Sequence, residues 1–243
     1  MKILSNQIFW LGAMTAFATV FLGLFIGMAT GKVAIGDSAR AVGGGAQAAA
    51  GNPDNAYPAE PEPQREIEVE KVTKDDWVRG DRNAKVSVVE FSDIDCPFCG
   101  RFHDSMKTVL ENYDGQINWV YRHLPLAALH PQAEAKAIAA ECVGKLSDND
   151  TFWQYLDALF VSQAADEVTA EATNLGIDAA AFEECRQDPK MAEKVKDQLA
   201  QAERAGGQGT PYSVILAGDE KIPVNGAVPV EQLTALIEQA LGS

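Results

Sequence analysis

The chain has 243 residues, of which 35 are acidic and 20 are basic, so its formal net charge is −15. It offers no cluster of lysine or arginine to neutralise phosphates, which disfavours nucleic acids and anionic lipid surfaces as partners. Its four cysteines and three histidines are the candidates for thiol, metal or acid–base chemistry.

The N-terminal region contains a long stretch without charge, from Ile8 to Ala29. At a rise of about 1.5 Å per residue this stretch is long enough to cross a bilayer, so we predict a signal-anchor helix within residues 1–30. The alternative is a signal peptide that is cleaved near Ala29, where small residues cluster. Residues 31–65 are rich in glycine, alanine and proline and show no apolar period, which predicts a flexible linker.

Residues 66–243 have the length of one domain and carry strand and helix patterns in turn. A block without strand signals, at about 128–206, precedes a closing strand–strand–helix unit. Proline, aspartate or threonine stands near the start of each helix in this block, and glycines supply several of the stops. The expected strands are 66–72, 85–91, 116–124, 211–216 and 221–224, and the expected helices are 97–113, 131–146, 150–161, 168–175, 178–187, 189–205 and 229–241.

The second expected strand leads directly into the sequence Cys96-Pro97-Phe98-Cys99. A strand that feeds two cysteines three residues apart at the start of a helix is typical of a reversible dithiol. Pro97 suits the first helical position, which places Cys96 at the N-cap beside unpaired backbone N–H groups. These groups and the helix dipole favour the thiolate, so we expect Cys96 to have a lowered pKa and to attack, and Cys99 to be the resolving thiol.

Residues 88–99, Val-Val-Glu-Phe-Ser-Asp-Ile-Asp-Cys-Pro-Phe-Cys, resemble the DsbA-type thiol-disulfide oxidoreductases. The resemblance extends over about residues 66–243, through Leu129-His130-Pro131, Phe152-Trp153 and Gly209-Thr210-Pro211. It implies an α/β, thioredoxin-like fold in which the block at about 128–206 is a helical insertion.

The same resemblance implies how the dithiol meets its substrate. Pro211 is expected to take a cis peptide bond and to lie against the dithiol, which keeps the Cys96 sulfur open to a peptide strand. The backbone of Thr210 would pair with that strand, and Pro97 and Phe98 would contribute to the substrate-binding surface. No cofactor or metal is implied.

Glu90 lies six residues before Cys96 on a strand that is otherwise apolar. The resemblance implies that an acidic residue at this offset relays a proton to or from Cys99. Burial near a thiol would raise the pKa of such a carboxyl and allow proton exchange near neutral pH. The alternative is a glutamate that faces solvent or pairs with a lysine.

The other two cysteines, Cys142 and Cys185, both fall in the helical block. Four cysteines permit three pairings, and we favour 96–99 with 142–185 because the first pair is local and the second lies in one subdomain. The second bond would be structural, and the alternative is two buried free thiols. A zinc site built from all four cysteines is disfavoured, since the second pair is split between helices.

The histidines give weaker signals. His103 lies one turn beyond Cys99 and is expected to be a packing or helix-surface residue, although it could face the dithiol. His130 precedes a proline and is expected at a helix start. The most oxidising relatives have histidine where this chain has Phe98, which argues against strong oxidising power.

The resemblance implies an oxidoreductase at the bacterial inner membrane with its catalytic domain in the periplasm or other extracytoplasmic space. It would introduce disulfides into exported proteins through a mixed disulfide at Cys96, and a membrane partner of the DsbB or quinone-linked type would reoxidise it. Two alternatives stay open: a reductase or isomerase that another donor keeps reduced, and a peptide-binding chaperone whose redox activity is secondary.

Overall fold

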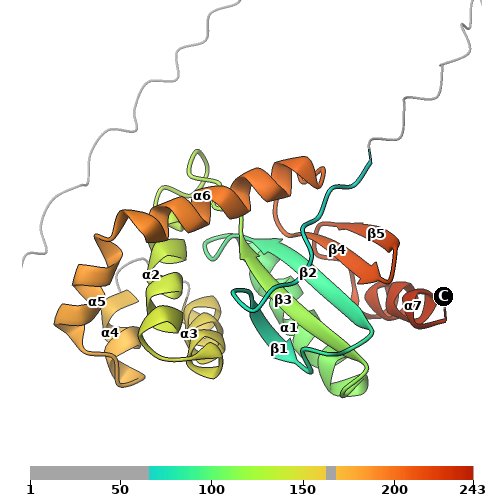
Figure 1. Cartoon of the computed structure of the whole chain (residues 1–243), viewed down its shortest axis with the longest axis horizontal. Coiled ribbons are helices and arrows are strands. Elements are labelled where there is room, and N and C mark those ends of the chain that lie inside the picture. The colour runs from blue at the N-terminus through green and yellow to red at the C-terminus, as the bar shows by residue number, and fades with distance from the viewer. Residues whose placement is uncertain (1–65, 163–167, 243) are drawn as a thin grey trace, which may run out of the picture. The chain divides into compact units, whose positions relative to one another are not determined.

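The computed structural model describes residues 66–162 and 168–242, in which five strands form a single mixed sheet of order β1-β3-β2-β4-β5 (Figure 1). The two central neighbours β2 and β3 run parallel, and the other pairs are antiparallel. The sheet is therefore thioredoxin-like in its mixed pairing. The strands are β1 Trp77–Gly80, β2 Val86–Ser92, β3 Ile117–His123, β4 Tyr212–Ala217 and β5 Glu220–Asn225.

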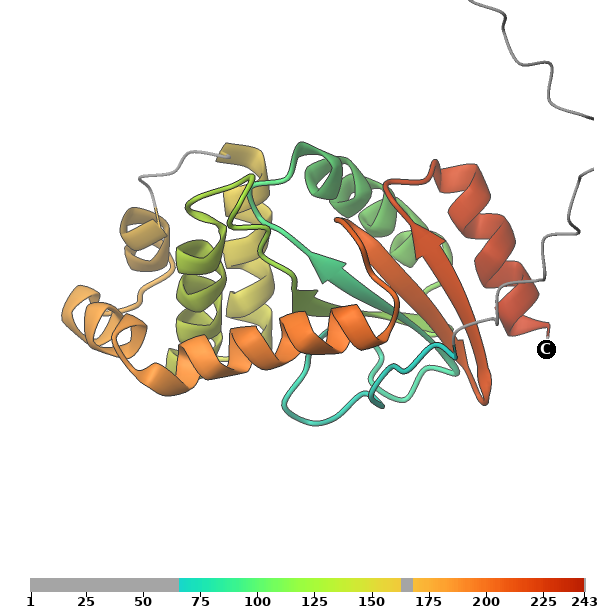
Figure 2. The same cartoon turned by 90° about the horizontal axis from the view of Figure 1, so that it is seen from above.

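Helices cover both faces of the sheet. On one face lie α1 (Pro97–Asn112) and α7 (Val230–Leu241), and on the other lies α6 (Pro189–Arg204), as Figure 2 shows. Side chains alternate between the faces along a strand. Val88 accordingly packs into the core under α1, and Val89 joins the smaller cluster under α6.

The helical insertion lies beside the sheet, next to the edge strand β1 (Figure 1). It contains α2 (Ala133–Leu146), α3 (Asn149–Ser162), α4 (Val168–Asn174) and α5 (Ala179–Arg186). Gly144 lets α2 approach β1 closely, because a Cβ there would lie 2.3 Å from the Trp77 ring. That ring also stacks on Phe152 of α3, with centroids 4.6 Å apart. The insertion is thus anchored to the sheet edge by aromatic packing.

Residues 66–72 form no strand, so that expectation is wrong, and the edge position belongs to β1, which the sequence pattern did not reveal. The apolar residues of this segment pack against the core under α6, which accounts for the alternation. Its backbone is held by a side chain instead of a strand: the Arg122 guanidinium donates to the carbonyls of Glu70 and Lys71 at 3.1 and 3.4 Å. The other expected helices and strands are present, with ends that differ by at most two residues.

The predicted signal-anchor (residues 1–30) and the predicted linker (31–65) lie outside the described residues. Within residues 66–162 and 168–242, no helix is long and apolar enough to span a bilayer.

Candidate active site

The dithiol lies where β2 ends and α1 begins. A tight turn joins them: the Asp93 carbonyl accepts from the Cys96 N–H at 3.1 Å, and the Asp93 carboxylate accepts from the Asp95 N–H at 2.9 Å. Cys96 has extended backbone angles at the N-cap, and Pro97 occupies the first helical turn. The local sequence therefore positions the first sulfur at the helix N-terminus.

The Cys96 sulfur faces the loop that precedes β4. Its Sγ lies 3.6 Å from the Thr210 carbonyl oxygen, and the peptide bond between Thr210 and Pro211 is cis. Both cysteines of the pair are free thiols in the structure. The Cys99 thiol faces the Cys96 sulfur and is the main cause that lowers the pKa of Cys96 to about 5, despite the opposing effect of burial. The Thr210 side chain and the backbone N–H groups of Cys99 and Phe98 add to this effect.

Cys99 is fully buried one turn further along α1. Burial, together with the neighbouring Cys96 and the Glu90 carboxyl, raises the pKa of the Cys99 thiol. The Asp93 N–H points to this sulfur at 3.4 Å. At neutral pH the pair consequently holds one thiolate, on Cys96, and one thiol, on Cys99.

Glu90 is completely buried on the face of the sheet that α1 covers. Its Oε2 accepts from the Trp119 indole N–H at 2.8 Å, so the alternative of a solvent-facing or lysine-paired glutamate is wrong. Burial raises the pKa of Glu90 to about 7 even though hydrogen bonds from Ser92 and Trp119 lower it. A carboxyl group that titrates near neutral pH therefore lies near the buried sulfur, and its charge raises the pKa of that thiol.

Comparison with known proteins decides the family. The sequence profile of the thioredoxin family matches residues 72–239. The chain belongs to the thioredoxin family. The solved structures of DsbA2 from Pseudomonas aeruginosa (TM-score 0.60, 23% identity, covering 70% of this chain and 96% of that one) and BdbD from Bacillus subtilis (TM-score 0.62, 23% identity, covering 73% and 98%) share its fold. The expected thioredoxin-like fold with a helical insertion is confirmed.

Curated relatives of this thioredoxin-family chain are longer proteins. A sequence named Na⁺/H⁺ antiporter NhaA 1 from Salinispora arenicola is 32% identical over 168 residues, which are 68% of this chain and 24% of that protein. The chain therefore spans about a quarter of the length of the curated relatives it matches.

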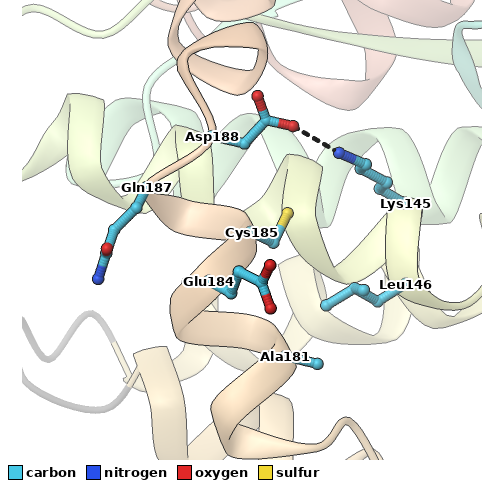
Figure 3. A pocket seen from close by; sticks show the side chains of 7 residues that line it. All are labelled: Lys145, Leu146, Ala181, Glu184, Cys185, Gln187 and Asp188. Carbon is cyan, nitrogen blue, oxygen red and sulfur yellow. Dashed lines mark hydrogen bonds and ion pairs between the residues drawn. The ribbon is translucent and has the colours of Figure 1, made fainter.

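The second cysteine pair of this thioredoxin-family domain lies in the insertion. Cys142 of α2 and Cys185 of α5 form a disulfide that closes a separation of 43 residues, so the four cysteines make two pairs and not one zinc site. Cys185 borders a surface hollow of about 580 Å³ between α2 and α5, at whose edge Lys145 pairs with Asp188 at 2.8 Å (Figure 3). The residues that line this hollow come from the insertion, so it is separate from the dithiol.

Two histidines, His103 and His123, are buried away from solvent. His103 binds Asp157 through Nε2 at 2.6 Å and packs against Trp119 and Phe160, so it is a packing residue. Arg79 binds the same carboxylate at 2.7 Å. Within the described ranges, 66–162 and 168–242, no group of three or more histidine, cysteine or acidic side chains could hold a metal ion.

His130 lies in the loop before α2 and not at a helix start, since that helix begins at Ala133. Its Nδ1 lies 2.9 Å from the buried carboxylate of Asp93. Neither this contact nor the Trp119–Glu90 hydrogen bond was expected from the sequence. Both join segments far apart in the chain, and neither leaves a local pattern.

Next to Cys96, Phe98 is 53% exposed, with the Arg101 guanidinium 4.4 Å from its ring centroid.

Proposed function

We propose that this domain is a thiol-disulfide oxidase that introduces disulfides into exported proteins. The observation that carries the proposal is the asymmetry of the dithiol. Cys96 lies at the N-cap of α1 and Cys99 is fully buried one turn further on, with the pKa of Cys96 lowered to about 5 and the pKa of Cys99 raised. A stabilised thiolate stabilises the reduced pair and makes its disulfide more oxidising. Reference values are a pKa of about 7 for thioredoxin and about 3.5 for DsbA, so Cys96 lies between a reductant and a strong oxidant.

In the proposed reaction a substrate thiolate attacks the Cys96 sulfur of the oxidised pair. The bond between Cys96 and Cys99 breaks, and Cys99 leaves with the electron pair and takes the proton of the Glu90 carboxyl. A second substrate thiolate then attacks the substrate sulfur of the mixed disulfide and releases the Cys96 thiolate. The substrate loses two electrons and the dithiol gains them, so both sides balance.

Substrates would dock beside the sulfur. The backbone of Thr210 would pair with an extended peptide, Pro211 would keep Cys96 open to it, and Pro97 with the exposed ring of Phe98 would supply contact surface. The Cys142–Cys185 disulfide supports an oxidising, extracytoplasmic location such as the periplasm. We place the chain at the bacterial inner membrane through residues 1–30, with a membrane partner of the DsbB or quinone-linked type to reoxidise it.

The decisive test is the reduction potential of the Cys96–Cys99 pair, measured on the full chain in mild detergent against glutathione buffers. A value well above that of thioredoxin, about −270 mV, and toward that of DsbA, about −120 mV, supports an oxidase. A value near −270 mV would instead support a reductase. Cys99→Ser should accumulate a mixed disulfide with a disulfide-bonded two-cysteine peptide, whose S–S bond the Cys96 thiolate attacks, and Cys96→Ser should not. Accumulation on the Cys96→Ser protein would overturn the assignment of the attacking sulfur.

A further inference from the structure

We propose that His130 is a positioning residue of the dithiol, whose imidazolium, held by the buried Asp93 carboxylate, stabilises the Cys96 thiolate. This inference deepens the proposed function, on which it rests, by assigning part of the control of the attacking sulfur to a residue outside the Cys-Pro-Phe-Cys sequence.

The Asp93 side chain is fully excluded from solvent and still binds three donors. Its Oδ1 accepts from the Asp95 N–H at 2.9 Å, and its Oδ2 accepts from the Leu126 N–H at 2.8 Å and faces His130 Nδ1 at 2.9 Å. A buried carboxylate is costly unless it is paired and hydrogen-bonded. Protonated His130 supplies the cation that the two backbone groups cannot.

The same aspartate holds both sulfurs in place through its backbone. Its carbonyl accepts from the Cys96 N–H at 3.1 Å, and its N–H points to Cys99 Sγ at 3.4 Å. An unpaired negative charge in this turn would oppose a second negative charge on Cys96. Pairing with His130 removes that penalty and adds a positive charge near the thiolate.

The charges that act on His130 come from Asp93 and Asp95 in the turn between β2 and α1 and from Cys96 at the start of α1. The hydrogen bond with Asp93 is the main cause that raises the pKa of His130. Burial is the next largest effect and opposes it, and the charges of Asp93, Cys96 and Asp95 each add to the rise. Lys136 of α2 pairs with Asp95 in the same region. Because an interaction between two charges is mutual, the thiolate that favours protonated His130 must itself be favoured by it.

The first test titrates the histidines by NMR in the full chain, labelled selectively at its three histidines and held in mild detergent. The Cys96–Cys99 pair is either oxidised or reduced, with Cys142–Cys185 kept intact and checked by alkylation and mass. We expect the pKa of His130 to be higher in the reduced protein, where the thiolate is present. His103 serves as the internal control, since the main charges acting on it are Asp157, Arg79 and Lys107. Equal values for His130 in both states would overturn the proposal.

The second test removes the positive charge of His130 but keeps a hydrogen-bond donor for the Asp93 carboxylate. His130→Asn should lower the acid dissociation constant of Cys96 about three- to tenfold, followed by thiolate absorbance and by alkylation rate against pH. The two measurements should agree in sign, because the interaction between the His130 and Cys96 charges is mutual. His103→Asn, the matched histidine–aspartate control, should leave Cys96 unchanged.

An unchanged Cys96 in His130→Asn, or an equal change in His103→Asn, would overturn the assignment. Both tests measure ionisation and not substrate turnover. A protein that shows the coupling but a thioredoxin-like potential would refute the proposed oxidase and leave the role of His130 standing.

Discussion

Glu90→Gln should stabilise the domain at neutral pH and leave its stability unchanged in acid. The pKa of Glu90 is about 7 in the folded protein against 4.5 for an ordinary glutamate, mainly because the side chain is buried. Each pKa unit corresponds to about 1.4 kcal/mol, so the full difference amounts to about 3 kcal/mol. The stabilising effect of protonated Glu90 is complete below pH 4.5 and is lost as the pH rises through 7.

Glutamine is a close match for the protonated side chain, because its amide oxygen can still accept from the Trp119 N–H. It has no charge to desolvate. The unfolding free energy of the wild-type protein should therefore fall between pH 4.5 and 7.5. The unfolding free energy of Glu90→Gln should lack the part of this fall that comes from Glu90. The gap between the two should grow to about 3 kcal/mol at pH 7.5 and close near pH 4.

Glu141 provides the matched control, since it is equally buried but has a lowered pKa, held down against burial by His123 and Lys194. Glu141→Gln should destabilise the domain at pH 7.5, because it leaves Lys194 without the carboxylate that binds it at 2.6 Å. Urea unfolding of the full chain, followed by tryptophan fluorescence with the dithiol reduced and Cys142–Cys185 intact, measures both variants. Destabilisation by Glu90→Gln at pH 7.5, or an effect that does not depend on pH, would refute the reasoning.

Three further changes test the packing of the helical insertion. Replacing Cys142 and Cys185 together by serine should lower the unfolding free energy by about 4 kcal/mol, because a loop of 43 residues is no longer closed, and urea unfolding measures the loss. Gly144→Ala should cost about 1–3 kcal/mol and lower the melting temperature, since the new methyl group would overlap the Trp77 ring, whereas an unchanged melting temperature would contradict the close approach. Asp157→Asn should cost about 2 kcal/mol at neutral pH, because an arginine and a histidine lose their shared carboxylate. The lowered pKa of Asp157 predicts that the cost of Asp157→Asn fades as the pH falls below 3.8, which urea unfolding at pH 2–7 would show.

The parts of the site that the sequence predicted are those with a local cause. The spacing of Cys96 and Cys99 and the proline between them are enough to place both sulfurs on the first turn of a helix. The period of two along β2 places Glu90 on the same face as Val88, under α1, and so beside the buried sulfur. In each case neighbours in the sequence determine the geometry.

The parts that the sequence did not predict depend on contacts between distant segments. The alternation of polar and apolar residues at 66–72 fits an edge strand and equally a segment that packs one side on the core. Only Arg122, some 50 residues away, favours the second arrangement. Trp119 is 29 residues from Glu90, and His130 is 37 residues from Asp93. A residue that acts on the dithiol from such a distance shows no spacing to recognise.

The ionisation of the dithiol also explains how Phe98 is compatible with a reactive thiolate. The main stabilising group for the Cys96 thiolate is the Cys99 thiol, and Cys99 stays protonated chiefly because it is buried. Burial of one sulfur thus maintains the donor that stabilises the charge on the other, without a polar side chain between them. If a donor at position 98 were needed, a hydrophobic residue there would raise the pKa of Cys96 toward that of a free thiol. Because Cys99 stabilises the negative charge on Cys96, position 98 needs no hydrogen-bond donor. The Phe98 side chain, which is 53% exposed, instead contributes to the surface beside the dithiol.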